Sequence, residues 1–136
     1  MLKFIPIKAQ AGITGFESPA ADYQMLGLSL DKLLIEHPSA TYIGLANGES
    51  MVELGIFDGD LLVIDRSVNA SNGDVIVANL NGVFVCKQID KYNHRLLSSS
   101  STHQAYEIRE GDDFQIEGVV VRSIRLHRKL NLDFFV

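Results

Sequence analysis

Short apolar runs separated by turn residues dominate the sequence from residue 41 onward. The runs lie at residues 41–46, 61–64, 75–78, 83–85, 105–108 and 114–126. Most have the length of a strand and are bounded by glycine, asparagine or aspartate, the residues that favour turns. Asn81-Gly82 separates two of them and is the dipeptide typical of a two-residue hairpin turn. We therefore predict antiparallel strands throughout this part of the chain.

This succession of short strands predicts the fold class. With little helix between them, the strands favour a mainly β domain with a curled antiparallel sheet over the parallel sheet of an α/β protein. One short helix is expected at residues 28–35, where Ser29 or Asp31 can cap the first turn and Pro38 stops the segment. We expect this helix to bury its leucines.

The N-terminal residues follow a different pattern. Residues 1–24 show no sustained period of 2 or 3.6 and contain two of the three prolines, so an extended N-terminal arm (1–24) is expected before a single domain (25–136). Pro6 interrupts the first apolar run, which is too short for the roughly 7–15 apolar residues of a secretory signal. No later run approaches the roughly 20 apolar residues of a membrane span. We expect a soluble, cytoplasmic protein without a membrane anchor.

Composition and charge narrow the function further. A chain of 136 residues, 46% of them hydrophobic, can build one core. Its 12 basic and 17 acidic residues give a net charge of −5, which argues against direct sequence-specific DNA binding. Cys86 is the single cysteine, and neither cysteines nor histidines show a metal-ligand spacing. No disulfide, metal or cofactor is expected, and the basic residues at 122–129 fit the polar face of a final strand.

Ser50 is the first candidate for chemistry. It follows Asn47-Gly48-Glu49 directly after a predicted strand, where a glycine permits a sharp turn that presents a side chain at the strand end. Most serines beside glycines only complete turns, so this signal alone is weak. The serine run Ser98–Ser101 is interpreted as a plain loop.

Lys87 is the second candidate. On a strand it shares one face with Val85 and Ile89. Two interpretations remain open. The ammonium reaches water along its apolar stem, or burial penalises the charged form and lowers the pKa of the amine from its usual value of about 10.4. A lysine of the second kind can serve as a general base.

Six segments resemble the LexA/UmuD family of self-cleaving Ser/Lys peptidases (peptidase family S24). They are residues 18–23, 37–42, 48–51, 58–65, 73–78 and 84–87. They follow the family order almost without gaps and cover nearly the whole chain. The family's usual Pro-x-Asn after a leucine pair is replaced here by Ser98-Ser99-Ser100. Because this chain leaves no room for the helix-turn-helix domain of a LexA repressor, it resembles the UmuD branch.

The resemblance implies a function and a set of partners. Ser50 matches the family's nucleophile and Lys87 its general base, with backbone N–H groups near Ser50 stabilising the oxyanion. It also implies a peptidase domain of the LexA/signal peptidase type, a homodimer, activation by RecA filaments on single-stranded DNA, and partnership with a UmuC-type translesion polymerase. One rival is a dimeric interaction module that regulates a polymerase or the SOS response without cutting itself. A second is a type I signal peptidase relative, which should carry a membrane anchor.

Two bonds of the arm compete as the cleavage site. Gap-free matching to the family through residues 15–19 places the cut at Thr14-Gly15. Side-chain chemistry favours Ala11-Gly12, because a small alanine fits a shallow pocket whereas a β-branched threonine is stiff at χ1. We predict cleavage at Ala11-Gly12, with residues 13–15 as a short insertion.

Overall fold

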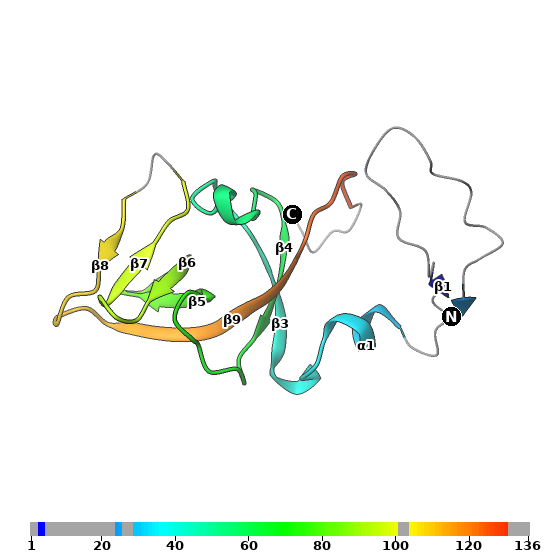
Figure 1. Cartoon of the computed structure of the whole chain (residues 1–136), viewed down its shortest axis with the longest axis horizontal. Helices are drawn as coiled ribbons and strands as arrows, with labels where there is room; N and C mark the ends of the chain where they lie inside the picture. The colour runs from blue at the N-terminus through cyan, green and yellow to red at the C-terminus, as the bar shows by residue number, and fades with distance from the viewer. Residues whose placement is uncertain (1–2, 5–23, 26–28, 101–103, 131–136) are drawn as a thin grey trace. The chain divides into compact units, whose positions relative to one another are not determined.

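The computed structural model describes residues 3–4, 24–25, 29–100 and 104–130 of the chain (Figure 1). The chain divides into two units, Met1–Glu36 and His37–Val136. In the first unit, β1 (Lys3–Phe4) pairs antiparallel with β2 (Gln24–Met25). Both candidate cleavage bonds lie outside the described residues. The expected arm at 1–24 and its boundary with the domain at 25–136 therefore stay predictions.

Helix α1 (Leu30–Leu34) forms where the sequence predicts a helix. Ser29 is its N-cap, and the Ser29 hydroxyl accepts a hydrogen bond from the backbone N–H of Lys32 at 3.4 Å. The expectation that this helix buries its leucines is wrong. None of its residues is buried, and the exposed fractions of Leu30 and Leu33 are 57% and 49%. Five residues make little more than one helical turn, which is too short for a continuous apolar stripe.

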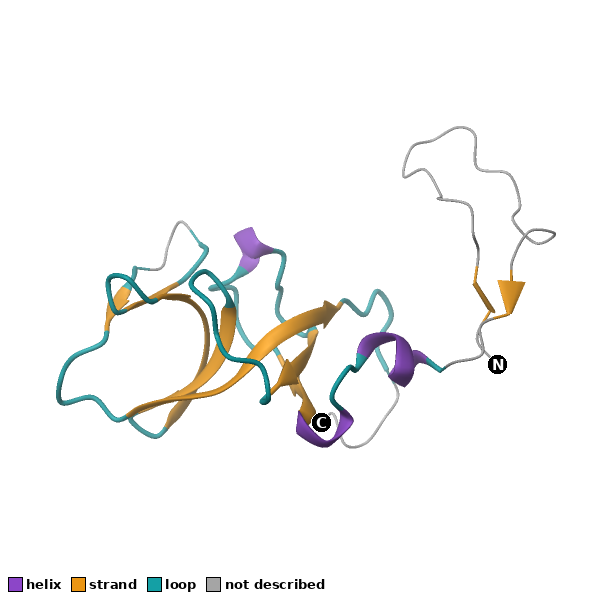
Figure 2. Cartoon of the chain, turned by 60° about the horizontal axis from the view of Figure 1, so that its bottom comes forward, coloured by secondary structure: helices purple, strands orange, loops and turns teal. Residues whose placement is uncertain are grey.

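The second unit is built on an open, seven-stranded sheet (Figure 2). All of its paired strands are antiparallel, as the sequence predicted. The strand order is β3-β4-β9-β5-β6-β7-β8. The strands are β3 (Thr41–Leu45), β4 (Leu61–Asp65), β5 (Val75–Leu80), β6 (Val83–Asp90), β7 (Arg95–Leu97), β8 (Tyr106–Glu107) and β9 (Phe114–Ile124). Two 3-10 turns, η2 (Pro38–Ala40) and η3 (Val52–Leu54), precede and follow β3. The three-residue strand β7 was not anticipated.

Strand β9 joins the two halves of the sheet. Its first part pairs with β5 and its second part with β4, and the register shifts once against each partner. Figure 1 shows it as the long orange strand that crosses this unit. A Cβ atom on Gly118 would lie 2.6 Å from Cγ2 of Ile64 and 3.2 Å from the carbonyl oxygen of Asp65. Glycine is therefore required where β9 lies close to the end of β4, its neighbour in the sheet.

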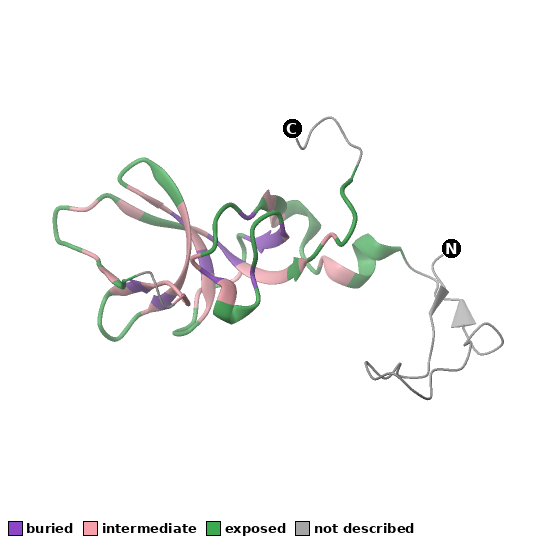
Figure 3. Ribbon diagram, turned by 90° about the horizontal axis from the view of Figure 1, so that it is seen from above, coloured by how far each residue is buried: buried purple, intermediate pink, exposed green. Residues whose placement is uncertain are grey.

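Two clusters of buried side chains form the core. One contains Ala46, Met51, Ile56, Leu62 and Ile64, and the other contains Ile76, Ala78, Ile89, Leu96 and Val119. Strand β5 contributes Ile76 and Ala78 to the second cluster while Val75 and Val77 pack against the first, as the alternation of a strand requires. The sheet is thus packed on both faces, and its buried residues concentrate along the central strands (Figure 3).

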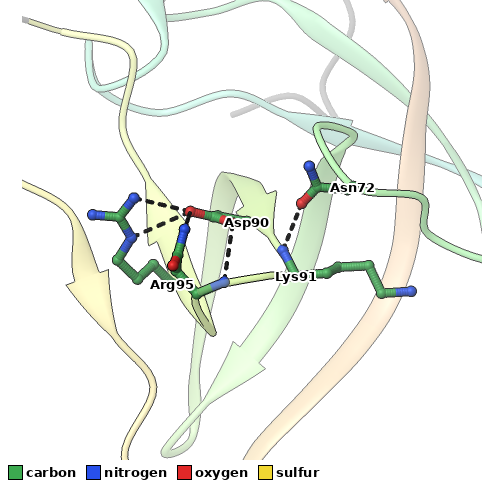
Figure 4. Close-up of polar contacts among 5 residues, drawn as sticks. Asn72, Asp90, Lys91 and Arg95 are labelled. Atoms are coloured by element: carbon green, nitrogen blue, oxygen red, sulfur yellow. Dashed lines mark hydrogen bonds and ion pairs between the residues drawn. The ribbon is translucent and has the colours of Figure 1, made fainter.

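A polar network closes the hairpin between β6 and β7 (Figure 4). The Asp90 carboxylate accepts hydrogen bonds from Nη2 of Arg95 and Nδ2 of Asn93, each at 2.9 Å. These bonds lower the pKa of Asp90. The backbone N–H of Lys91 donates to Oδ1 of Asn72 at 2.7 Å. The network fixes the turn and with it the pairing register of the two strands.

Candidate active site

Ser50 lies in the turn between β3 and η3. Gly48 begins this turn with a φ of 94°, a conformation that favours glycine, and its N–H donates to Oδ1 of Asp58 at 2.7 Å. Met51, the next residue after Ser50, is only 3% exposed and belongs to the first core cluster. Ser50 itself is half-buried. A buried neighbour and a bonded glycine therefore hold the serine from both sides.

The loop that returns from Ser50 to β4 is tied to the end of β3. The backbone N–H of Ala46 donates to the carbonyl of Asp60, and that of Gly59 donates to the carbonyl of Ala46, both at 2.8 Å. The N–H of Ile56 donates to the carbonyl of Met51 at 3.2 Å. The segment carrying Ser50 is thus a closed loop with both ends bonded to each other.

Arg125 fixes the far side of this loop. Its Nε donates a hydrogen bond to Oδ1 of the buried Asp60 at 3.2 Å, and its Nη2 donates one to the carbonyl of Gly55 at 3.1 Å. The guanidinium also lies 3.9 Å from the ring centroid of Phe57. Burial opposes ionisation of Asp60, but hydrogen bonds from Arg125 and the Phe57 backbone outweigh it and lower the pKa of Asp60. One member of the basic cluster seen in the sequence is therefore committed to an internal ion pair.

Lys87 lies on β6 and is half-buried. Burial lowers the pKa of its amine, and the neighbouring Cys86 opposes the shift only in part. Two interpretations of Lys87 were left open by the sequence. The lowered pKa agrees with the second, in which burial penalises the charged form of the amine. The Nζ atom donates a hydrogen bond to Oγ of Ser98 at 2.8 Å.

Ser50 and Lys87 line the same pocket. Its volume is about 190 Å³. The other lining residues are Ala46, Asn47, Gly48, Met51, Ile56, Phe84, Val85 and Cys86. A larger cavity of about 610 Å³ shares five of these residues and continues along β3, where Tyr42 and Leu45 line it. The structure therefore brings the two sequence-predicted residues to one small recess that opens on a wider groove.

Cys86 is a second possible nucleophile in this pocket. Burial raises the pKa of its thiol to about 11, although the nearby Lys87 lowers it in part. The thiol therefore stays protonated at neutral pH, and the thiolate is the reactive form of cysteine. Ser50 is the stronger candidate, because its hydroxyl can be activated by a base in the same pocket.

Backbone donors are available beside Ser50. Within the part of the chain that the structure describes, the N–H groups of Ser50 and Met51 donate no hydrogen bond. Two adjacent free N–H groups next to a hydroxyl are a common arrangement for binding a developing oxyanion. In the sequence, backbone N–H donors near Ser50 were expected only from the family resemblance.

Ser98 is the residue at this site that sequence reasoning missed, because the serine run was interpreted as a plain loop. The contact with Lys87 follows from the pairing of β6 with β7, and β7 is too short to stand out in the sequence.

The described residues hold no group of three or more histidine, cysteine, aspartate or glutamate side chains that could bind a metal ion. Among the helices described, none is long and apolar enough to cross a membrane.

Comparison with known proteins gives one consistent result. The Peptidase S24-like family matches residues 3–121. The protein ImpA of Salmonella typhimurium is 34% identical over 125 residues, covering 92% of this chain and 86% of ImpA. The protein MucA of Escherichia coli is 36% identical over 125 residues, covering 90% of this chain and 86% of MucA. The LexA repressor of Stenotrophomonas maltophilia is 33% identical over 101 residues, covering 73% of this chain and 47% of the repressor.

Proposed function

Because the chain belongs to the Peptidase S24-like family, we propose that it is a self-cleaving serine peptidase with Ser50 as nucleophile and Lys87 as general base. One observation carries the proposal. Ser50 lines a pocket of about 190 Å³ together with Lys87, whose pKa is lowered by burial. A lowered pKa increases the fraction of neutral amine near physiological pH, and only the neutral amine can accept a proton.

The reaction follows from these groups. The neutral Lys87 amine takes the proton of the Ser50 hydroxyl while Oγ attacks the carbonyl carbon of the scissile peptide. The N–H groups of Ser50 and Met51 stabilise the resulting oxyanion. Lys87 then gives its proton to the departing amine nitrogen, which leaves an ester on Ser50. Water hydrolyses the ester with Lys87 again as base, and both residues return to their starting state.

The substrate in this proposal is the protein's own N-terminal arm. The groove of about 610 Å³ that joins the pocket can receive an extended segment. The pocket that contains Ser50 and Lys87 has a volume of only about 190 Å³, which favours a small side chain before the cut. Ala11 satisfies this requirement better than Thr14, so Ala11-Gly12 remains the proposed bond and Thr14-Gly15 the alternative.

The biological role we propose is that of a UmuD-like protein in SOS mutagenesis. The similarity to ImpA and MucA over most of all three chains supports it, as does the resemblance to the UmuD branch. In this role the protein is a cytoplasmic homodimer, RecA filaments on single-stranded DNA stimulate its cleavage, and the product works with a UmuC-type polymerase.

The RecA dependence provides a test of this role. Purified protein is incubated at neutral pH with RecA, single-stranded DNA and a nucleotide that sustains the filament, and its intact mass is followed in time. We expect loss of the arm in the wild type and no loss in Ser50→Ala. An unchanged half-life with and without filaments would contradict the proposed activation, and a dimer that never cleaves would favour the interaction module.

A further inference from the structure

The register of the β6–β7 hairpin places Ser98 opposite Lys87. Gln88 pairs with Leu97 and Ile89 with Leu96. One step further toward the pocket, the next opposed residues are Lys87 and Ser98. The backbone pairing of the two strands ends before this pair, and a side-chain hydrogen bond joins the two residues instead. Nζ of Lys87 donates to Oγ of Ser98 at 2.8 Å. The contact is therefore a product of the hairpin geometry.

The same segment is bonded to the turn that follows Ser50. The carbonyl of Ser99 accepts a hydrogen bond from the backbone N–H of Glu53 at 2.8 Å, and Oγ of Ser99 accepts one from the N–H of Leu54 at 3.1 Å. Glu53 and Leu54 belong to η3, which begins two residues after Ser50. Residues 98–99 thus contact both the base and the segment that carries the nucleophile.

We propose that Ser98 is a positioning residue that holds the Lys87 amine in place for proton transfer from Ser50. This proposal rests on the proposed function. A neutral amine has two N–H bonds and one lone pair. When one N–H bond is donated to Oγ of Ser98, the lone pair stays available to the Ser50 hydroxyl in the shared pocket. After proton transfer, the ammonium keeps the same acceptor.

Loss of this acceptor has two separate consequences. Lysine has a long, flexible side chain, so without Ser98 the amine samples orientations in which its lone pair is misdirected, and cleavage slows even when Lys87 is fully neutral. A hydroxyl oxygen also stabilises an ammonium more than a neutral amine. Removing it therefore favours the neutral form and moves the pH profile of cleavage to lower pH.

The experiment measures self-cleavage without activator as a function of pH. In Ser98→Ala we expect a plateau rate about tenfold or more below the wild type, the size of effect expected when a hydrogen bond to a charged group is lost, and a midpoint at lower pH. Ser98→Thr keeps the hydroxyl and should recover most of the rate. Ser71→Ala, at an exposed position outside both cavities, is the matched control.

A second measurement does not depend on cleavage. In the Ser50→Ala background, the reactivity of Lys87 toward acetic anhydride is measured against pH by mass spectrometry, with Ser98 present or replaced by alanine. We expect the titration of Lys87 to move to lower pH in the double variant. Equal titrations, or wild-type cleavage profiles in Ser98→Ala, would overturn the positioning role. Persistent cleavage in Ser50→Ala alone would instead overturn the proposed function.

Discussion

Ser50 and Lys87 open onto one pocket although the turn and the strand that carry them are not neighbours in the sheet. Among the strands that the structure describes, β3, which precedes Ser50, pairs only with β4, whereas β6 pairs with β5 and β7. The curl of the sheet brings the two segments together, and the two core clusters hold them there. The chemistry we propose therefore depends on tertiary packing as well as on Ser50 and Lys87 themselves.

The pH dependence of cleavage follows from the lowered pKa of Lys87. Below that pKa, the neutral fraction of the amine grows about tenfold per pH unit, so the rate without activator should rise from pH 7 and level off before the ordinary lysine pKa of 10.5. Mass spectrometry of samples incubated at a series of pH values across this range measures the cleavage rate. A flat rate from pH 7 to 10 would argue against a titrating lysine. Normal cleavage by Lys87→Arg at neutral pH would also argue against Lys87 as the base, because the guanidinium of arginine stays protonated and cannot accept a proton.

The position of the cut is tested by N-terminal sequencing of the large fragment. We expect a product that begins Gly-Ile-Thr, from cleavage at Ala11-Gly12. Ala11→Leu should slow the reaction strongly because the longer side chain does not fit a shallow pocket, whereas Thr14→Leu should have little effect. A product that begins Gly-Phe-Glu would assign the cut to Thr14-Gly15 instead.

Asp65 should contribute stability that depends on pH. Hydrogen bonds from the Ser67 hydroxyl and from His37 lower its pKa to about 2. Because the folded pKa lies below the unfolded one of about 3.9, this contribution is complete above the unfolded value and is lost as pH falls through about 2.

Asp65→Asn should therefore lower the free energy of unfolding at pH 7, and its difference from the wild type should shrink as pH approaches 2. Urea unfolding at several pH values measures this difference. Asp113→Asn, which changes an exposed carboxylate, is the control. A deficit of the same size at pH 7 and pH 2 would show that the ionised carboxylate is not the cause.

Gly118→Ala tests the close approach of β9 to the end of β4. The added Cβ meets Cγ2 of Ile64 at 2.6 Å, and such overpacking in a core costs about 1–3 kcal/mol. Gly111→Ala is the matched control, since a Cβ there meets nothing within 4 Å and its φ is not positive. Equal unfolding midpoints for the two variants would contradict the close approach.

Local signals in the sequence were sufficient for much of the fold. Asn81-Gly82 forms the expected hairpin turn with φ values of 53° and 86°, because few other dipeptides tolerate two positive φ angles. Ser29, one of the two caps that the sequence offered, caps α1. These features depend on a few neighbouring residues, so a single sequence contains the information that they need.

Features set by long-range packing could not be predicted in the same way. The need for glycine at position 118 arises only because β9 lies close to Ile64 in the folded chain. The role of Ser98 depends on the β6–β7 register, and the exposure of Leu30 depends on what packs against α1. The sequence offered Ser50 and Lys87 as candidates, and their shared pocket became visible only in the folded chain.

In the proposed reaction Ser50 cuts this chain with Lys87 as its base. Intact mass spectrometry of purified wild-type protein, Ser50→Ala and Lys87→Ala, incubated side by side at alkaline pH, tests it most directly. We expect the wild type to lose its arm, whereas both variants keep their full mass and their folded circular dichroism spectra. Arm loss at the wild-type rate in a pure Ser50→Ala sample would contradict it.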